Sequence, residues 1–302
     1  SNRLITGRSL VRSQVGPPIM LISTVLEDSR AVIFIYNNRG IMEPRPMMDR
    51  LEAVFSIVPK AHAIADIGTD HGYLAVELIN RNRAEFVIAG DVHKGPLESA
   101  KEYVQSCGLT SKVDCRLGDG LKVTEKGELN GAICCGMGGY LMRDIVDAGP
   151  EPLEFYVLQP QNGQKELRQY MVQKGYVIVL EIIVEDAGKL YTAFLAVRND
   201  QVEAYTGMTE YVDVYQSLPE DSLLWAVGAL LEHERPSLWT KYIEYLIYQR
   251  QCALDGMTEQ LSHTDKYKDL EREVKFLHGL LEDRKTVSYT HLRAHETLRH
   301  LV

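Results

Sequence analysis

The stretch that decides the fold of this chain is Ala63-Ile-Ala-Asp-Ile-Gly-Thr-Asp-His-Gly-Tyr-Leu-Ala75. Residues 64–67 form a short apolar run that enters a turn bracketed by Gly68 and Gly72, and a helix is expected over residues 73–80. A strand that reaches a helix through a glycine turn brings backbone N–H groups and the helix N-terminus close to a ligand. The stretch therefore predicts a nucleotide-type turn, although an ordinary strand-to-helix turn can have the same residues.

The spacing of the glycines separates two classes of ligand. A dinucleotide-binding fold uses Gly-x-Gly-x-x-Gly, in which three close glycines accommodate a pyrophosphate. Here the pattern is Asp66-x-Gly68-x-x-x-Gly72, with two glycines and an acidic residue before the first. A carboxylate at this place suits a ligand with a cationic end, such as the amino-acid part of S-adenosylmethionine, better than a diphosphate.

Acidic residues also follow the next two predicted strands. Residues 86–91 form a buried-type strand that ends in Asp91, about twenty residues after the glycine turn, the spacing of a ribose-binding carboxylate. A helix over 95–105 leads to a third strand over 113–117 and then to Gly118-Asp-Gly-Leu121. Asp119 could accept a hydrogen bond from an exocyclic amine such as adenine N6, although Gly-Asp-Gly is also a common turn.

The fourth and fifth predicted strands run into further loops suited to a ligand. Residues 132–135 precede Gly136-Met-Gly-Gly139, whose glycines leave the backbone free to approach a ligand closely. Residues 156–158 precede Gln159-Pro-Gln-Asn162, and helices are expected over 141–148 and 164–174.

The strand pattern then predicts the fold class. Residues 176–184 and 190–197 are two more strands, and the segment between them is too short for a parallel crossover, so they should pair antiparallel. Five alternating βα units with a terminal hairpin are typical of the Rossmann-like, seven-stranded methyltransferase sheet, an α/β fold, rather than of a nicotinamide dehydrogenase.

The end of the chain has a different pattern. Helices with charged outer faces are expected over 223–233, 239–254 and 270–281, which indicates a helical hairpin or a short coiled coil. We assign residues 42–200 to a methyltransferase domain and 201–286 to this helical domain. Its candidate phosphate contacts are Lys241, Arg250, Lys266, Lys268, Arg272 and Lys275, although interspersed acids favour a solvated face.

The two ends of the chain do not resemble the rest. Residues 1–41 contain only short apolar runs with no following pattern, and residues 287–302 are rich in Thr, His and Arg. We expect both segments to be translated vector or adapter sequence, with a natural start at Met42.

Composition limits the function classes. The chain of 302 residues has a formal net charge of −9, which counts against broad electrostatic binding of nucleic acid. Its five cysteines form no Cys-x-x-Cys pair, which argues against a disulfide framework or a structural zinc site and for a reducing, cytoplasmic location. The sequence has no run of ~18 apolar residues, so no transmembrane helix is predicted.

Short motifs occur in a fixed order over residues 48–200. They are Arg50-Leu51, Asp66-Ile-Gly-Thr-Asp-His71 with Tyr73-Leu74, Gly118-Asp-Gly-Leu121, Gly136-Met-Gly-Gly139, Leu158-Gln-Pro160 and Gly188-Lys-x-Tyr191. This ordered set closely resembles the bacterial tRNA adenine-22 N1-methyltransferases. The resemblance implies a Rossmann-like methyltransferase domain joined to a C-terminal coiled-coil domain. It also implies S-adenosylmethionine as cofactor and tRNA as substrate, methylated at adenine N1 in the D-arm region.

The resemblance further implies residue roles. The expected cofactor-binding residues are Asp66, Gly68, His71, Tyr73, Asp91, Val92, Asp119 and Gly120. The expected catalytic residues are Asp70, Gly136, Met137, Gly138 and Gln159, and the expected substrate-binding residues are Arg50, Asn162 and Tyr191. No metal is implied.

The chemistry of the implied reaction assigns a purpose to one of these residues. Adenine N1 already carries a lone pair, so methyl transfer needs in-line alignment more than a strong base. The adenine ring gains positive charge as the methyl group arrives, and the Asp70 carboxylate would stabilise that charge and accept from N6. Because N1 lies on the Watson–Crick edge, the base has to leave its duplex.

Two alternatives remain open at the level of sequence. The acidic charge favours a methyltransferase that acts on a small molecule or a protein. A non-enzymatic reading is a cofactor-binding module that recognises RNA or a partner through its helical tail.

Overall fold

In the computed structural model, the chain forms two compact units, residues 1–47 and residues 48–302. The structure describes the backbone of residues 7–11, 20–27, 30–37 and 40–42, and residues 49–207, 213–257 and 263–282. The first unit contains a four-stranded antiparallel sheet in the order β1-β2-β3-β4. Its strands are β1 (Gly7–Val11), β2 (Met20–Glu27), β3 (Arg30–Asn37) and β4 (Gly40–Met42). The residue pattern did not predict these strands, and the segment 287–302 lies outside the described residues.

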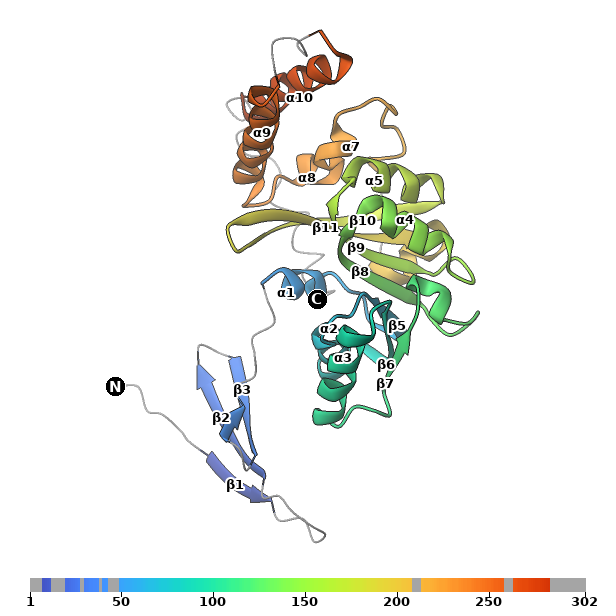
Figure 1. Ribbon diagram of the computed structural model, residues 1–302, viewed down its shortest axis with the longest axis vertical. Helices are drawn as coiled ribbons and strands as arrows, with labels where there is room; N and C mark the ends of the chain where they lie inside the picture. The colour runs from blue at the N-terminus through green and yellow to red at the C-terminus, as the bar shows by residue number, and fades with distance from the viewer. Residues whose placement is uncertain are drawn as a thin grey trace, which may run out of the picture. The chain divides into compact units, whose positions relative to one another are not determined.

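The second unit is built on a seven-stranded sheet in the order β10-β11-β9-β8-β5-β6-β7 (Figure 1). Its strands are β5 (Ala61–Ile67), β6 (Ala84–Asp91), β7 (Val113–Leu117), β8 (Gly131–Gly138), β9 (Phe155–Asn162), β10 (Tyr176–Asp186) and β11 (Lys189–Arg198). Strands β5 to β9 pair in parallel, whereas β11 runs antiparallel to both β9 and β10. The predicted methyltransferase sheet with its terminal hairpin is confirmed.

Helices connect most of the parallel strands, as Figure 1 shows. Helix α1 (Asp49–Ser56) precedes β5, and the connecting helices are α2 (Tyr73–Asn80), α3 (Lys94–Ser106), α4 (Gly139–Asp147) and α5 (Gln164–Gln173), with a short 3-10 helix η1 (Gly120–Val123) between β7 and β8. The central strands are covered on both faces, and Ile64, Val87 and Ile133 are fully buried. This burial explains why these strands are continuous apolar runs rather than alternating ones.

The strand order also determines where a ligand can bind. Strand β5 lies between β6 and β8, and the chain passes through β6 and β7 on one side before it crosses to β8 on the other. In open α/β sheets, ligands bind in the crevice outside the carboxyl ends of the strands at such a switch point. The glycine loops that follow β5 and end β8 therefore meet at this edge.

The C-terminal helices pack on the β10–β11 hairpin. The elements are η2 (Asn199–Gln201), α6 (Val202–Thr206), α7 (Leu224–Val227), α8 (Ala229–Glu234), α9 (Trp239–Asp255) and α10 (Asp265–Glu282). One hydrophobic cluster joins Leu190 of β11 to Trp239 of α9 and Leu277 of α10. Figure 1 shows α8 and α9 beside the hairpin. The predicted helical pair is present, and its coiled-coil geometry stays a prediction.

The single helix predicted over 223–233 is wrong. Gly228 has φ +108° and ψ 106°, which ends α7 and separates it from α8. A residue with this backbone conformation cannot continue an α-helix.

Within the described ranges, no helix is long and apolar enough to cross a membrane.

Candidate functional site

The turn after β5 requires its glycines. Gly68 and Gly72 have φ values of +75° and +73°, in the left-handed region that glycine adopts without steric cost. The Gly68 and Thr69 N–H groups both donate to the Gly90 carbonyl, at 2.8 and 3.1 Å, which joins the turn to the end of β6. A β-carbon at Gly72 would lie 3.3 Å from Ala100 Cα. The turn is thus fixed between β6 and α3.

Asp66 lies buried beneath this turn, with a relative exposure of 4%. The Thr69 hydroxyl donates to Asp66 Oδ2 at 2.7 Å. Burial raises the pKa of Asp66 to about 6, and the nearby Asp91 carboxylate contributes in the same direction. No basic residue is among the causes of this shift. A cationic ligand group beside Asp66 would therefore be bound by a carboxylate that lacks a resident counter-charge.

Asp91, at the end of β6, is held in place by backbone donors. Its Oδ1 accepts from His93 N at 2.8 Å, and its Oδ2 accepts from Asp70 N at 3.4 Å. Val92 follows it and is 58% exposed. Leu117, at the end of the adjacent strand β7, pairs with Asp91 in the register and is 56% exposed. Two exposed apolar side chains beside an oriented carboxylate suit the ring and the ribose of a nucleoside.

Sequence reasoning missed Leu117. Its signal was available, because a large apolar residue at the end of a predicted strand immediately precedes the Gly-Asp-Gly turn.

The next two predicted residues, Asp119 and Gly120, have contacts of their own. Asp119 pairs with Lys122 at 2.5 Å, with both side chains exposed, and a β-carbon at Gly120 would lie 2.9 Å from Ile145 of α4.

Asp70, predicted as the catalytic acid, lies on the outer side of the first turn. Its φ is +52°, an uncommon conformation that Asp tolerates better than most residues, and its side chain is 69% exposed. The Asp70 Oδ1 atom lies 3.7 Å from His71 Nε2. The His71 ring contacts Tyr73, and Tyr73 packs edge-on against Tyr103 at 4.9 Å. Asp70, His71 and Tyr73 therefore lie next to one another on the outer side of this turn, whereas Asp66 is buried beneath it.

The glycine loop at the end of β8 reaches the first turn. Gly136 has φ +74°, and its N–H donates to Gln159 Oε1 at 3.1 Å. Gln159 is fully buried and donates to the Pro160 carbonyl at 3.2 Å, so its contacts support the loop from below. A β-carbon at Gly68 would lie 2.9 Å from Met137 Cε. Met137 thus brings the two glycine loops together.

The predicted substrate-binding residues surround the same loop. The Arg50 guanidinium lies over the Tyr191 ring at 5.3 Å, and its Nε is 4.0 Å from Asp186 Oδ2. This Nε atom is buried and has no hydrogen-bond partner among the residues that the structure describes. A β-carbon at Gly136 would lie 3.8 Å from Arg50 Nη1. Arg50 from α1 and Tyr191 from β11 therefore lie beside the loop at the end of β8.

Asn162 lies on the other side of this loop. Its Oδ1 is 2.9 Å from where a β-carbon at Gly138 would be. A β-carbon at Gly139 would lie 2.5 Å from the Gly163 carbonyl oxygen, so the backbones at the beginnings of α4 and α5 lie close together. Only glycine allows this approach, so the loop geometry depends on the Gly136–Gly139 run.

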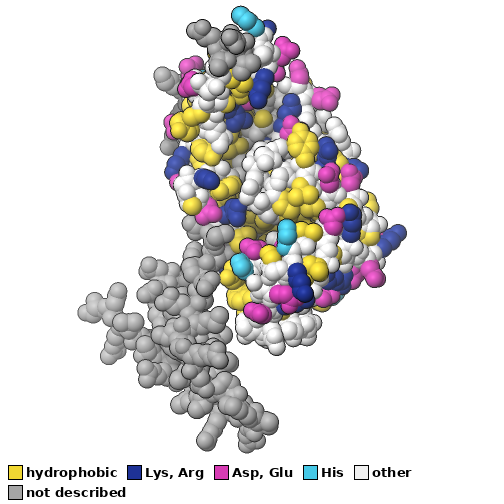
Figure 2. Space-filling model, in the orientation of Figure 1, with side chains coloured by type: hydrophobic (Ala, Val, Ile, Leu, Met, Phe, Trp, Pro, Cys, Tyr) yellow, Lys and Arg dark blue, Asp and Glu magenta, His cyan; other side chains and the backbone are white. Residues whose placement is uncertain are grey.

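Two exposed side chains at the beginning of α4 were also missed. Tyr140 and Leu141 are 51% and 49% exposed and follow the glycine run directly. Arg143 lies 5.3 Å from the Tyr140 ring centroid. Figure 2 shows hydrophobic side chains exposed among charged ones on the face that carries α4 and α5. Large apolar residues after a ligand-type loop were the available signal.

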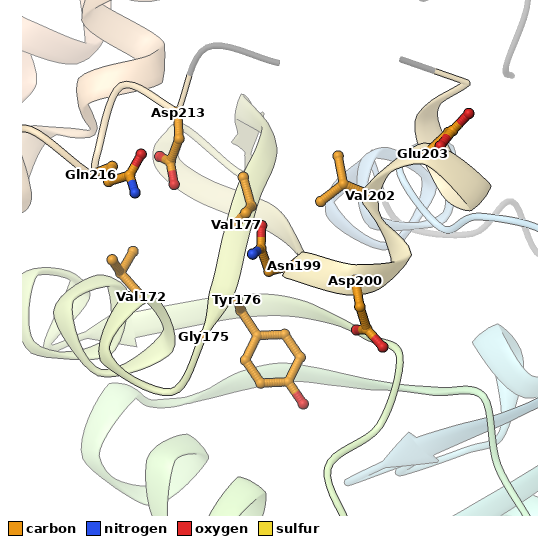
Figure 3. Close-up of a pocket in the computed structure, with 10 residues that line it drawn as sticks. All are labelled: Val172, Gly175, Tyr176, Val177, Asn199, Asp200, Val202, Glu203, Asp213 and Gln216. Carbon is orange, nitrogen blue, oxygen red and sulfur yellow. The ribbon is translucent and has the colours of Figure 1, made fainter. Parts of the chain in front are cut away.

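A cavity of about 500 Å³ lies elsewhere, at the amino end of β10. Its lining includes Val177 and Asn199, with Asp213 and Gln216 on one side of Val177 and Glu203 on the other (Figure 3). None of the predicted site residues lines this cavity. It lies at the opposite end of the sheet from the glycine loops that follow β5 and end β8.

The predicted phosphate contacts of the helical domain are only partly available. Lys241, Arg250 and Arg272 form ion pairs with Glu185, Glu273 and Asp269, respectively. Among the described residues, no group of three or more His, Cys, Asp or Glu side chains is arranged to hold a metal ion.

Comparison with known proteins identifies the family. A family model described as a methyltransferase domain matches residues 47–194. The Bacillus subtilis tRNA (adenine(22)-N(1))-methyltransferase is 32% identical over 250 residues, which are 80% of this chain and 99% of that protein. The crystal structure of the B. subtilis enzyme superposes with a TM-score of 0.59 at 31% identity, covering 79% of this chain and 97% of that chain.

A second solved structure comes from Streptococcus pneumoniae. It is described as a putative tRNA (m1A22) methyltransferase in complex with S-adenosyl-L-methionine. It superposes with a TM-score of 0.63 at 27% identity, covering 78% of this chain and 100% of that chain. Because the B. subtilis relative is matched along nearly its whole length, the chain belongs to the tRNA (adenine(22)-N(1))-methyltransferase family.

Proposed function

We propose that this chain transfers the methyl group of S-adenosylmethionine to N1 of adenine 22 in tRNA. The observation that carries the proposal is the match to the B. subtilis enzyme, which spans 99% of that protein and so includes both the crevice and the C-terminal helices. A methyltransferase for a small molecule would not need the second part of this match.

The residues at the crevice fit the cofactor. The buried Asp66 carboxylate is placed to bind the ammonium of the methionine part, because among the described residues it accepts from the Thr69 hydroxyl and no basic side chain contributes to its pKa shift. Asp91, held by two backbone donors, suits the ribose hydroxyls, and Val92 with Leu117 suits the adenine faces. Asp119 now pairs with Lys122, and it would accept a hydrogen bond from the adenine amine once this ion pair opens.

The chain's own residues would act on the target adenine as follows. When bound, the cofactor supplies an electrophilic methyl group on a sulfonium centre. The loop Gly136–Gly138 and Asn162 present backbone and amide groups to the Watson–Crick edge, and Arg50 with Tyr191 borders the base. Asp70 would stabilise the positive charge that the adenine ring gains as N1 is methylated. In this assignment Gln159 acts by holding Gly136.

Docking of the substrate is assigned to the rim of the crevice. The target base must leave its duplex for N1 to be reached. Exposed aromatic side chains bind unpaired bases by stacking, so Tyr140 is placed to stack on a nucleotide next to the target, and the exposed Leu141 beside it offers apolar contact. This arrangement lets an acidic protein bind tRNA through local contacts at the rim.

The test uses labelled S-adenosylmethionine and two tRNA transcripts that differ only at position 22. The transcript with adenine is expected to take up label and to stop reverse transcription at this nucleotide, because N1-methylation blocks base pairing. The transcript with guanine at position 22 is expected to stay unlabelled. Equal labelling of both transcripts, or of neither, would refute the proposal.

A further inference from the structure

The methyltransferase sheet and the C-terminal helices are joined by a buried ion pair. Arg168 of α5 and Glu181 of β10 have side chains with 0% exposure, and Arg168 Nε lies 2.7 Å from Glu181 Oε1. Both residues belong to the sheet and its flanking helix, and neither is among the predicted site residues. Charged residues are almost never buried in this way unless they are paired.

The ion pair also contacts residues outside α5 and β10. Arg168 Nη1 donates to the carbonyls of Trp225 and Ala226, at 2.9 and 3.3 Å. These carbonyls belong to the last turn of α7, where a helix has no backbone donors of its own. Arg168 thus binds the C-terminus of α7.

Glu181 satisfies the beginning of the next helix through a tyrosine. The Tyr215 hydroxyl donates to Glu181 Oε2 at 2.6 Å and accepts from Ala229 N, the first residue of α8, at 2.8 Å. Burial, together with the Glu181 carboxylate, raises the pKa of Tyr215 well above its usual range, so the hydroxyl keeps the proton it donates. The two charged residues therefore satisfy both sides of the break between α7 and α8.

The break itself is shaped to fit the pair. A β-carbon at Gly228 would lie 3.1 Å from Arg168 Nη2 and 3.0 Å from Glu181 Oε2. Only glycine fits there, at φ +108°. Helix α9 follows this break, and its Tyr242 hydroxyl donates to the Val227 carbonyl at 3.2 Å. Helix α9 is thus bonded to the same end of α7 that Arg168 binds.

The same hairpin connects this region to the crevice. Strand β10 carries Glu181 at its centre and Asp186, which faces Arg50, at its end. Strand β11 carries Tyr191, beneath Arg50, and Leu190, which packs against α9. A shift of the C-terminal helices against the hairpin would change where they lie relative to the crevice.

We propose that Arg168 and Glu181, with Tyr215, are positioning residues that fix α9 and α10 relative to the reaction site. One tRNA can then contact the reaction site and these helices at the same time. This inference rests on the proposed function for its substrate, tRNA. The claim that the pair fixes the position of α9 and α10 does not depend on that function. Loss of the pair should weaken productive tRNA binding and leave the cofactor crevice unchanged.

The chain offers a direct measure of this geometry. Cys107, at the end of α3, and Cys252, in α9, are exposed free thiols, one on each part, whereas Cys115 and Cys135 are half-buried and Cys134 is buried. Spin labels on Cys107 and Cys252, with mass spectrometry to verify two labels per chain, report the distance distribution between the parts. The wild type should give one narrow distribution.

The variants compare a buried and an exposed carboxylate on the same strand. Glu181→Gln should broaden the distribution, whereas Glu185→Gln should not, because Glu185 pairs with Lys241 of α9 at the surface, where ion pairs contribute little. If Glu181→Gln does not fold, the double variant Arg168→Met/Glu181→Leu removes both charges and keeps the core apolar. It should fold and also give a broad distribution.

Kinetics separate positioning from a merely structural role. The double variant should bind S-adenosylhomocysteine within twofold of wild type and raise KM for tRNA at least tenfold, with a smaller change in kcat. A narrow distribution in the folded double variant, or an unchanged KM, would overturn the inference. If wild type does not methylate tRNA, the proposed function fails, and the distance measurement still decides whether the pair positions the helices.

Discussion

The buried carboxylate of Asp66 makes a prediction whose size follows from the structure. Burial raises its pKa from 3.8 to about 6, so the folded chain binds a proton more tightly there than the unfolded chain does. A raised carboxyl pKa contributes stability that is present below pH 4 and is lost as the pH rises towards and through 6. The loss amounts to about 3 kcal/mol by pH 7, since each pKa unit corresponds to about 1.4 kcal/mol.

Asp66→Asn removes this ionisation and keeps the shape. The amide oxygen can still accept from the Thr69 hydroxyl, which now donates to Asp66 Oδ2 at 2.7 Å. Without cofactor, we expect the variant to exceed wild type in free energy of unfolding by about 3 kcal/mol at pH 8, by about half of that at pH 5, and by nothing at pH 3.5. Urea unfolding curves at the three pH values measure this difference.

Asp66→Asn should stabilise the fold and weaken cofactor binding. If Asp66 binds the ammonium group, the variant should bind S-adenosylhomocysteine at least tenfold more weakly at pH 8. Wild type should lose affinity as the pH falls below about 6 and release a proton on binding there, which titration calorimetry in two buffers detects. A stability gain equal at pH 8 and pH 3.5, or cofactor affinity independent of both pH and the substitution, would refute the reasoning.

Three further predictions concern the crevice. Asp70→Ala should abolish methylation while it leaves binding of S-adenosylhomocysteine within about threefold, and near-normal turnover in a labelled-tRNA assay would contradict its assignment. Gly68→Ala places a β-carbon 2.9 Å from Met137 Cε at φ +75°, so we expect at least tenfold weaker cofactor binding by calorimetry, with rescue by Met137→Ala at most partial because the backbone strain remains. Tyr140→Ala should raise KM for tRNA about tenfold with unchanged cofactor affinity, because stacking contributes about 1–3 kcal/mol per base, and an unchanged KM would remove Tyr140 from the docking surface.

Local sequence patterns were sufficient for the seven-stranded sheet and for the glycine turn after β5. A glycine turn, a strand that ends in Asp91 and a short hairpin each depend on neighbouring residues, and the order of the strands brings their carboxyl ends together. Asp66 and Asp91 were each predicted near the end of a strand, and these two strands, β5 and β6, pair side by side in the sheet.

Other features depended on contacts between distant residues. The helix predicted over 223–233 is broken at Gly228 because Arg168 and Glu181 occupy the space beside it, and both lie more than 40 residues earlier in the chain. Nothing in the local pattern of α5 or β10 marks these two charges as buried. Gln159 was predicted at the reaction site, and its burial beneath Gly136 became visible only when β8 and β9 were paired.

The sequence by itself thus determined the order of strands and helices from β5 to β11 and the glycine turn from residue 66 to residue 73, since these follow from short-range sterics and periodicity. The tertiary structure decided which polar residues are buried, which face the crevice and how the C-terminal helices attach to the hairpin. The physical reason is that burial and hydrogen bonding are properties of a residue's neighbours in space, and for Arg50 with Tyr191, or Arg168 with Trp225, those neighbours are far away in the sequence.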